Sequence, residues 1–241
     1  MHRAAQWLRR CQRSDGGIAP QEQVSESTWL TVLPLLWLPA LAEESIDRER
    51  AVEWVLAQTG RESGWVYRLR HCMLGTKSEI GIEHDGWPWY PGTAAWVGPT
   101  ALSILALKKL SRQRSSVSGL KDRMEQGQAF LLDRRCRDGG WNHGSTRALG
   151  YDSDSFPECT GLVLLALEGA QSDLAESIAR AEQHLATTRS REAADWLRLG
   201  LMAQGRKPPA PALPLRGGPM EAAVAALADA AATGNNLFLQ P

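Results

Sequence analysis

The chain has 241 residues and carries 27 Lys and Arg against 27 Asp and Glu, so its formal net charge at pH 7 is zero. This length supports one domain with a substantial hydrophobic core, and a neutral chain lacks the positive field that gathers nucleic acid, so a nucleic-acid-binding role is disfavoured. The four cysteines are scattered without a CxxC pair, which argues against a disulfide framework and predicts a reduced protein.

The first residues, MHRAAQWLRRCQR, are basic and lack the apolar core of a signal peptide, so we expect a cytoplasmic protein. The most apolar run, TWLTVLPLLWLPALA at 28–42, is too short to cross a bilayer. It contains Pro34 and Pro39, which predict a buried helix that kinks or stops early.

An aromatic residue followed by a glycine turn recurs three times along the chain. When Trp7, Trp54 and Phe130 are aligned, the residues from eight positions later read DGGI at 15–18, ESGW at 62–65 and DGGW at 138–141. Glycine supplies the left-handed conformation that ends many helices. Each copy therefore predicts a helix, a stop and a turn.

After each turn comes a second, almost wholly apolar stretch that opens on a threonine: Thr28, Thr100 and Thr160. Each repeat is therefore a helical hairpin, with a more polar first helix and an apolar second helix. That contrast predicts an inner ring of second helices inside an outer ring of first helices. The predicted fold is all-α, a partial α/α toroid whose inner helices begin near these threonines.

In chain order, we expect hairpins over residues 3–42, 46–111 and 120–170 within a single domain that spans residues 1–241. A degenerate pair without the glycine turn follows over 172–204, then a proline-rich connector over 205–219 and a last helix over 220–233. This organisation gives about nine helices.

The aromatic helix, the DGGW-type turn and the threonine-initiated apolar helix together resemble the QW-type repeats of squalene-hopene cyclases and the related repeats of protein prenyltransferase beta subunits. Both families are α/α toroids. The likeness covers about residues 3–170, and DGWPWYPGTAAWVGPTALSILAL at 85–107 is similar to the way this family begins an inner helix. About nine helices are fewer than a closed toroid of this family needs, so the resemblance implies an incomplete ring, or one closed by self-association or a partner chain.

The resemblance also implies where catalytic residues would lie. Cyclases carry a DxDDTA motif at the start of one inner helix, and prenyltransferases carry Asp and Cys zinc ligands in what we take to be equivalent columns. In this chain the columns hold Val24 and Glu26, Trp96 and Gly98, and Phe156 and Glu158. Neither motif is present.

Glu158 and Glu26 are nevertheless the candidates for an atypical catalytic acid, because both stand in the column of the cyclase acid. A helix N-terminus stabilises a carboxylate as the anion. A working acid there needs a neighbouring carboxylate or an apolar pocket that raises its pKa. The run SFPE at 155–158 also fits a capping box with Ser155 as N-cap, and we favour this interpretation of Glu158.

Metal ligands are not apparent in the sequence. The pairs His71 with Cys72 and His143 with Asp154 lack metal-ligand spacing, so we expect no zinc site and no cofactor. Asp152 and Asp154 are candidates for acids that support a catalytic residue, or for a fragment of a cation-binding loop. No glycine and distal glutamate complete a calcium loop, so we favour a solvated loop.

Tryptophan is unusually frequent, with ten residues against three Tyr and three Phe. The repeat register predicts that four of them stack between repeats: Trp7, Trp54, Trp65 and Trp141. A long insertion over residues 66–97 holds a second set: Trp87, Trp89, Tyr90 and Trp96. Long aromatic loops in compact domains are often functional, and aromatic faces stabilise carbocations in cyclases. We predict that this second set lines a ligand site.

Two functional hypotheses follow. The first is a binding protein with an apolar groove for an isoprenoid or other hydrophobic small molecule, closed by self-association when empty and compatible with peripheral membrane contact. The inner-helix leucines expected to line the groove are Leu30, Leu33, Leu102, Leu105, Leu162 and Leu165. The second is a cyclase-like or prenyltransferase-like enzyme that uses Glu158 or Glu26. A carbohydrate-active toroid is a weaker third hypothesis, because no carboxylate pair has a distinctive spacing. The missing motifs favour the first.

Overall fold

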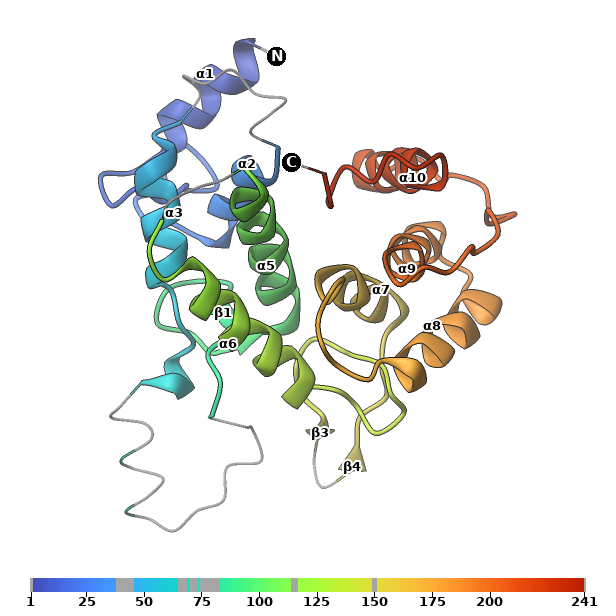
Figure 1. The fold of residues 1–241 in the computed structure, drawn as a ribbon. Helices are drawn as coiled ribbons and strands as arrows, with labels where there is room; N and C mark the ends of the chain where they lie inside the picture. Colours follow the sequence, from blue (N-terminus) through green and yellow to red (C-terminus); the bar gives the residue numbers. More distant parts are fainter. Residues whose placement is uncertain are drawn as a thin grey trace. The chain divides into compact units, whose positions relative to one another are not determined.

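The computed structural model describes residues 2–37, 46–64, 69, 73, 83–113, 117–148 and 151–240. Within these residues the chain is mostly helical, which confirms the all-α prediction, and nine α-helices are present (Figure 1). They are α1 (His2–Cys11), α2 (Val32–Trp37), α3 (Arg48–Ala57), α5 (Val97–Arg112), α6 (Leu120–Asp133), α7 (Pro157–Ala166), α8 (Ala175–Thr187), α9 (Arg191–Ala203) and α10 (Pro219–Ala232).

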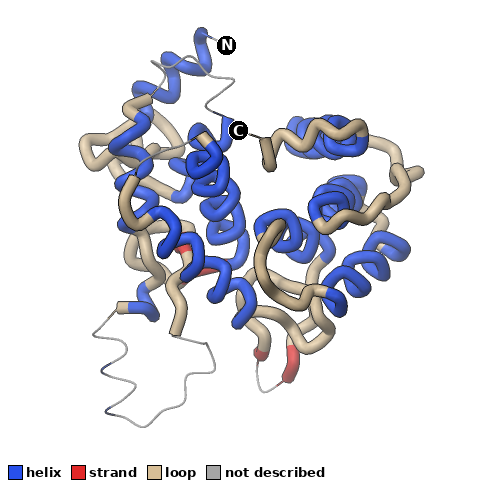
Figure 2. The backbone as a smooth tube through the Cα atoms, viewed as in Figure 1, coloured by secondary structure: helices blue, strands red, loops and turns tan. Residues whose placement is uncertain are grey.

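The described residues also form two short 3-10 helices and two short strand pairs. Two 3-10 helices, η1 (Trp29–Thr31) and η3 (Arg61–Ser63), lie in the first half of the chain. Two antiparallel strand pairs are formed by β1 (Trp87–Pro88) with β2 (Ala95–Trp96) and by β3 (Arg147–Ala148) with β4 (Tyr151–Asp152). Figure 2 shows how little of the backbone these strands occupy beside the helices.

The chain divides into two compact units, Met1–Phe130 and Leu131–Gln240. In the first unit, α2 packs against both α3 and α5. In the second unit, α7 packs against α8 and α9, and α10 packs on α9. Of the helical pairs predicted from the sequence, α8 and α9 pack against each other. The three preceding hairpins and the ring arrangement stay predictions.

The predicted threonines lie at or near the starts of η1, α5 and α7. Thr28 is the N-cap of η1, and its hydroxyl oxygen accepts a hydrogen bond from the Leu30 N–H. Thr100 and Thr160 lie in the first turns of α5 and α7, each three residues after the helix begins. Pro34 lies in the first turn of α2, where a missing N–H costs little; Pro39 lies outside the described residues.

A threonine hydroxyl accepts the first backbone N–H after each glycine turn. The three hydrogen bonds are Ile18 N to Thr31 Oγ1 at 2.8 Å, Trp87 N to Thr100 Oγ1 at 2.8 Å and Trp141 N to Thr160 Oγ1 at 3.0 Å. All three threonines are fully buried. This recurring hydrogen bond ties each turn to the helix that follows it. In the first copy the threonine that accepts it is Thr31 rather than the predicted Thr28.

The second copy of the turn differs from the predicted one. Its glycine and tryptophan are Gly86 and Trp87, because Trp87 makes the hydrogen bond to the inner-helix threonine that Trp141 makes in the third copy. Trp65, the predicted residue, lies outside the described residues. Glu62, which aligns with Asp138, accepts the Ala95 N–H at 2.9 Å, as Asp138 accepts the Ser155 N–H. The insertion therefore separates the acidic residue of this copy from its glycine and tryptophan.

Trp87 and Trp141 anchor their turns in the core. Their side chains are 2% and 0% exposed. Each indole N–H donates to a backbone carbonyl of the helix that precedes its turn, Val55 of α3 at 2.7 Å and Leu131 of α6 at 2.6 Å. A buried indole needs such an acceptor. The two tryptophans therefore make equivalent hydrogen bonds in their two copies of the turn.

The two other described tryptophans of the predicted stacking set differ from each other. Trp54 is buried, and its indole N–H donates to Asp15 Oδ2 at 3.0 Å, so it joins α3 to the first glycine turn. Trp7, in contrast, is 41% exposed and does not share this burial.

The threonine hydrogen bond gives a direct stability test. We expect Thr160→Val to lower the free energy of unfolding by about 1–3 kcal/mol, because valine keeps the shape but leaves the buried Trp141 N–H without an acceptor. Urea denaturation followed by circular dichroism measures the change. Thr187→Val, at an exposed position on α8, is the control and should change stability by less than about 0.5 kcal/mol. Equal stability of the two variants would contradict the assigned role.

Candidate functional site

Partly exposed aromatic rings gather around the β1–β2 hairpin of the first unit. Trp29 and Trp89 meet edge to face, with ring centroids 4.7 Å apart and an interplanar angle of 84°. The Trp29 N–H donates to the Trp89 carbonyl at 3.2 Å, which joins η1 to the hairpin. Trp96 and Tyr90 are 39% and 53% exposed. We call Trp29, Trp89, Tyr90 and Trp96 the aromatic surface.

Trp87 was predicted to belong to this site but lies beneath it. Its ring is 2% exposed, and the Arg123 guanidinium carbon stands 3.3 Å from the ring centroid in a cation–π contact. Trp87 therefore packs the core, and no ligand is needed to explain its position. Trp29, conversely, was missed by sequence reasoning, although it directly follows the predicted helix-starting Thr28.

Half-buried leucines adjoin the aromatic surface. A Cβ added at Gly98 in the first turn of α5 would lie 3.2 Å from the Trp89 ring, so this face of α5 meets the indole. Leu102 lies one helical turn later on the same face and is half-buried. Leu30 and Leu33, which follow Trp29 in the chain, are half-buried as well. The aromatic surface therefore continues into aliphatic side chains.

The other predicted groove residues are distributed unevenly. Leu105 and Leu165 are 0% exposed and belong to the cores of their units, whereas Leu162 on α7 is half-buried. The helices α5 and α7 thus expose one part of their apolar surface and bury the rest.

The two candidate acids are both exposed. Glu26 precedes η1, and Glu158 lies in the first turn of α7. An acid that protonates an alkene needs apolar surroundings that keep it neutral. An exposed position does not provide them.

The predicted capping box at Ser155 and Glu158 is wrong. The N-cap of α7 is Phe156, and no side chain caps the helix there. The Ser155 N–H donates to Asp138 Oδ2 at 3.1 Å, so it does not bind Glu158. Asp138 belongs to the DGGW turn, which the fold brings next to Ser155.

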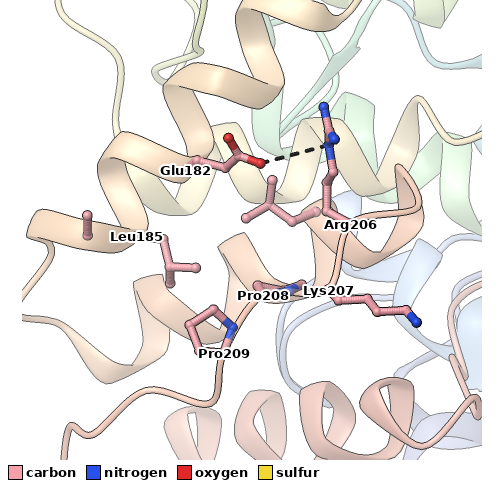
Figure 3. Close-up of a pocket in the computed structure, with 8 residues that line it drawn as sticks. Glu182, Leu185, Arg206, Lys207, Pro208 and Pro209 are labelled. Carbon is pink, nitrogen blue, oxygen red and sulfur yellow. Dashed lines mark ion pairs between the residues drawn. The ribbon is translucent and has the colours of Figure 1, made fainter.

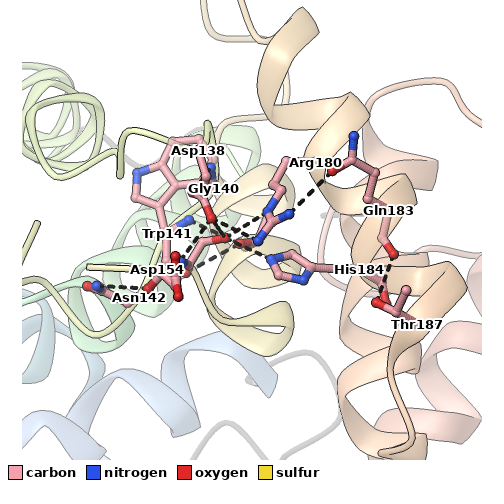
Figure 4. A network of polar contacts seen from close by, with 11 residues as sticks. Asp138, Gly140, Trp141, Asn142, Asp154, Arg180, Gln183, His184 and Thr187 are labelled. Carbon is pink, nitrogen blue, oxygen red and sulfur yellow. Dashed lines mark hydrogen bonds and ion pairs between the residues drawn. The ribbon is translucent and has the colours of Figure 1, made fainter. Parts of the chain in front are cut away.

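Asp138, Ser155, Arg180 and His184 form a polar network in the second unit (Figure 4). The Ser155 hydroxyl lies 2.8 Å from Asp138 Oδ2 and 2.7 Å from His184 Nε2. Arg180 Nη2 lies 2.9 Å from the same carboxylate oxygen. Since Arg180 and His184 are both on α8, the network holds α8 against the DGGW turn.

This network contains the residue types of a serine hydrolase but not their arrangement. In a hydrolase the carboxylate orients the histidine, which takes the serine proton. Here the carboxylate binds the serine itself, and Ser155 is 4% exposed. The Ser155 hydroxyl donates to Asp138, and its oxygen accepts from His184 and from Arg180 Nε at 3.3 Å, so both of its lone pairs are occupied. We therefore assign the network a structural role.

The charge states agree with that hydrogen-bond pattern. Burial raises the pKa of Asp138, but the Ser155 and Gly140 hydrogen bonds and the charge of Arg180 outweigh it and place the pKa below its usual range. Burial, reinforced by Arg180, lowers the pKa of His184. Neutral His184 can then donate from Nε2 to the Ser155 oxygen while the Ser155 hydroxyl donates to ionised Asp138.

His184 also makes stability depend on pH. Because its pKa is lowered in the folded state, the unfolded chain binds the proton more readily, and we expect the free energy of unfolding to fall as pH falls below about 6.5. His184→Gln keeps a side-chain N–H donor but removes this titration. Urea denaturation at about pH 7.5 and 5.5 should show a smaller acid-induced loss in the variant than in the wild type. An equal loss in both proteins would contradict the assignment.

Cys159 and His143 form a second pair at the start of α7, with Sγ and Nδ1 3.5 Å apart. Burial raises the pKa of the Cys159 thiol to about 12, with further contributions from Glu158 and Cys136. A thiol nucleophile needs a lowered pKa, so this pair is not an activated dyad. Among the described residues no cluster of three or more His, Cys, Asp or Glu could hold a metal ion; His71 and Cys72 lie outside them.

The two aspartates of the YDSDS run, Asp152 and Asp154, both make polar contacts within the second unit. Asp152 lies in β4 rather than in a loop, and its carboxylate pairs with Arg137 at 3.0 Å and Arg147 at 3.8 Å. Asp154 is exposed, and its carbonyl accepts a hydrogen bond from the Asn142 amide at 3.2 Å. Both contacts support the hairpin around β3 and β4.

A cavity of about 380 Å³ lies between α8, α9 and the proline-rich connector in the second unit (Figure 3). Its walls are mostly apolar, with Leu185, Leu201, Pro208 and Pro209, while Glu182 and Arg206 lie 3.8 Å apart beside them. Sequence reasoning missed this cavity because the connector contributes one wall and carries no periodic pattern.

Comparison of the chain with models of known protein families and with curated protein sequences finds no match. The likeness to cyclase and prenyltransferase repeats therefore remains an expectation. No helix in the described part of the chain combines the length and hydropathy needed to span a membrane.

Proposed function

We propose that the protein binds an elongated apolar molecule of the isoprenoid class at the aromatic surface of its first unit. The observation that carries the proposal is the set of partly exposed rings, Trp29, Trp89, Tyr90 and Trp96, on and beside one short hairpin. A group of exposed apolar side chains of this kind often marks a binding site. Backbone and ring contacts hold Trp29 and Trp89 together before a ligand arrives.

The chemistry of the surface supports an unsaturated hydrocarbon chain. Indole and phenol rings offer flat, polarizable faces to apolar groups, and the neighbouring leucines extend the contact to aliphatic segments. The resemblance of the repeats to those of isoprenoid-handling toroids points to the same class. Binding without catalysis is favoured, because Glu26 and Glu158 are exposed and neither family motif is present.

Fluorescence titration tests the proposal. Adding farnesol to the protein should change tryptophan emission and give a saturable curve. Trp89→Ala and Trp96→Ala should each weaken binding by about tenfold, as expected for the loss of 1–2 kcal/mol of aromatic contact. Trp7→Ala is the matched control, since Trp7 is similarly exposed but lies on α1.

Two results would count against binding at this surface. One is an unchanged emission spectrum at saturating farnesol, confirmed by calorimetry. The other is a loss of affinity in Trp7→Ala equal to that in Trp89→Ala.

Self-association is the proposed state of the empty protein. Without a ligand, a second copy or a partner chain would cover the exposed rings, because contiguous apolar surface in water favours association. Sedimentation velocity should then show a larger species that farnesol converts to a smaller one. A monomer under both conditions would remove this part of the proposal while leaving ligand binding testable.

A further inference from the structure

Three arginines line a cavity of about 230 Å³ in the second unit, between the start of α9 and the segment that leads into α10. The arginines are Arg189, Arg191 and Arg216, and the other lining residues are Ser190, Leu213, Pro214 and Glu221. The cavity lies beyond residue 170, outside the part of the chain that carries the family resemblance.

The Arg191 guanidinium is held in place by the protein. Its Nε lies 2.6 Å from Asp195 Oδ2, and its Nη1 donates to the Leu213 carbonyl at 2.9 Å. Asp195 is itself completely buried and also binds Arg198 at 2.7 Å. A guanidinium fixed in this way loses little further side-chain entropy when an anion binds.

The opposite wall is also fixed. Glu221 Oε2 accepts the backbone N–H groups of Arg216 at 2.7 Å and of Gly217 at 3.0 Å, which ties the segment before α10 to the first turn of that helix. The side chains of Arg189 and Arg216 have no hydrogen-bond or ion-pair partner among the described residues. The unpaired side chains of Arg189 and Arg216 and the immobilised guanidinium of Arg191 therefore line a single cavity.

We propose that this cavity binds the phosphate group of a small phosphate monoester. A guanidinium presents paired N–H donors that match the oxygens of a phosphate, and such charge-assisted hydrogen bonds are among the strongest in proteins. Arg191 is paired with Asp195, so Arg189 and Arg216 outnumber the Glu221 carboxylate and leave the lining positive, which complements an anion. Glu221 Oε1 and the Ser190 hydroxyl remain as partners for a hydroxyl group on the rest of the molecule.

Isothermal titration calorimetry at low salt, with inorganic phosphate and with glycerol phosphate as probes, tests the proposal. Both probes should bind, and glycerol phosphate should bind more tightly because its hydroxyls reach the polar wall. Arg189→Gln and Arg216→Gln should each weaken binding by about tenfold, the loss expected for one charge-assisted hydrogen bond. Both side chains are exposed, so neither substitution should unfold the protein, and circular dichroism checks this.

Arg206→Gln is the matched control, because Arg206 is an exposed arginine of the same unit that lines the other cavity. Affinity reduced equally in all three variants would show a nonspecific charge effect and overturn the proposal. Absence of heat with both probes would overturn it as well. Binding to vesicles that contain phosphatidic acid, without binding to either soluble probe, would replace the small molecule with a membrane surface.

The inference does not depend on isoprenoid binding. Trp89→Ala should leave the phosphate titration unchanged, and Arg216→Gln should leave the farnesol titration unchanged. The two proposals can therefore fail separately.

Discussion

Gly161→Ala is expected to lower the free energy of unfolding by about 3 kcal/mol, a large effect for one methyl group. A Cβ at this position would lie 2.4 Å from the backbone carbon and oxygen of Trp196 on α9. Gly200 faces it in the same way, since a Cβ there would lie 2.2 Å from the Gly161 carbonyl oxygen. Backbone atoms cannot rotate away as a side chain can, so α7 and α9 would have to separate.

Urea denaturation of the variant measures this loss. Helix propensity acts in the opposite direction, because alanine favours a helix over glycine by about 1 kcal/mol. A variant as stable as the wild type, or more stable, would show that the two helices do not approach this closely. Gly218→Ala is the control, since an added Cβ there meets no atom within 4 Å; we expect a loss of less than about 1 kcal/mol.

Arg123→Met is the second substitution with a large expected effect, a loss of about 3 kcal/mol or more. The buried guanidinium donates to the carbonyls of Asp85 at 2.6 Å, Gln58 at 2.7 Å and Gly86 at 2.9 Å. It also covers the face of Trp87. Methionine keeps much of the side-chain volume but leaves the three carbonyl oxygens without their donor.

Two further variants separate this role from simple loss of charge. Arg123→Lys keeps the cation but cannot reach three carbonyls with a planar fork, so it should recover only part of the lost stability. Lys121→Met removes an exposed cation from the same helix and should change stability by less than about 0.5 kcal/mol. Full recovery by lysine would show that charge, rather than the hydrogen-bond geometry, stabilises the turn.

The helical character of the chain could be predicted from sequence because helix signals are local. Apolar spacing, threonines and glycines identify where helices begin and end without reference to distant residues. The boundaries followed closely, with α10 beginning at Pro219 against a predicted start at residue 220. The connector before it has no helix or strand, as its prolines predicted.

The second glycine turn was misplaced because two segments carry similar residues. Gly64 followed by Trp65 and Gly86 followed by Trp87 have the same local pattern. The distance to the threonine does not distinguish them, because Ile18 and Trp87 precede their threonines by 13 residues but Trp141 precedes Thr160 by 19. Only the hydrogen bond between Trp87 and Thr100 shows which segment forms the turn.

The remaining errors depended on tertiary contacts. Ser155 and Glu158 satisfy the spacing of a capping box, but Asp138 lies 17 residues away in sequence and binds the Ser155 N–H instead. Trp87 and Trp89 stand two residues apart in one insertion, yet one is buried under Arg123 and the other is half-buried beside Trp29. Composition reveals that aromatic rings are present but does not determine which of them face solvent.

The most direct test of the proposed function is to observe the ligand on the rings. In an NMR experiment with isotopically labelled protein and unlabelled farnesol, intermolecular nuclear Overhauser effects should connect the farnesyl methyl and vinyl protons to the indoles of Trp29, Trp89 and Trp96. The buried Trp87 should show none, because its ring is 2% exposed. Contacts confined to Leu185, Leu201 and the neighbouring prolines would place the ligand in the cavity of the second unit and contradict the proposal.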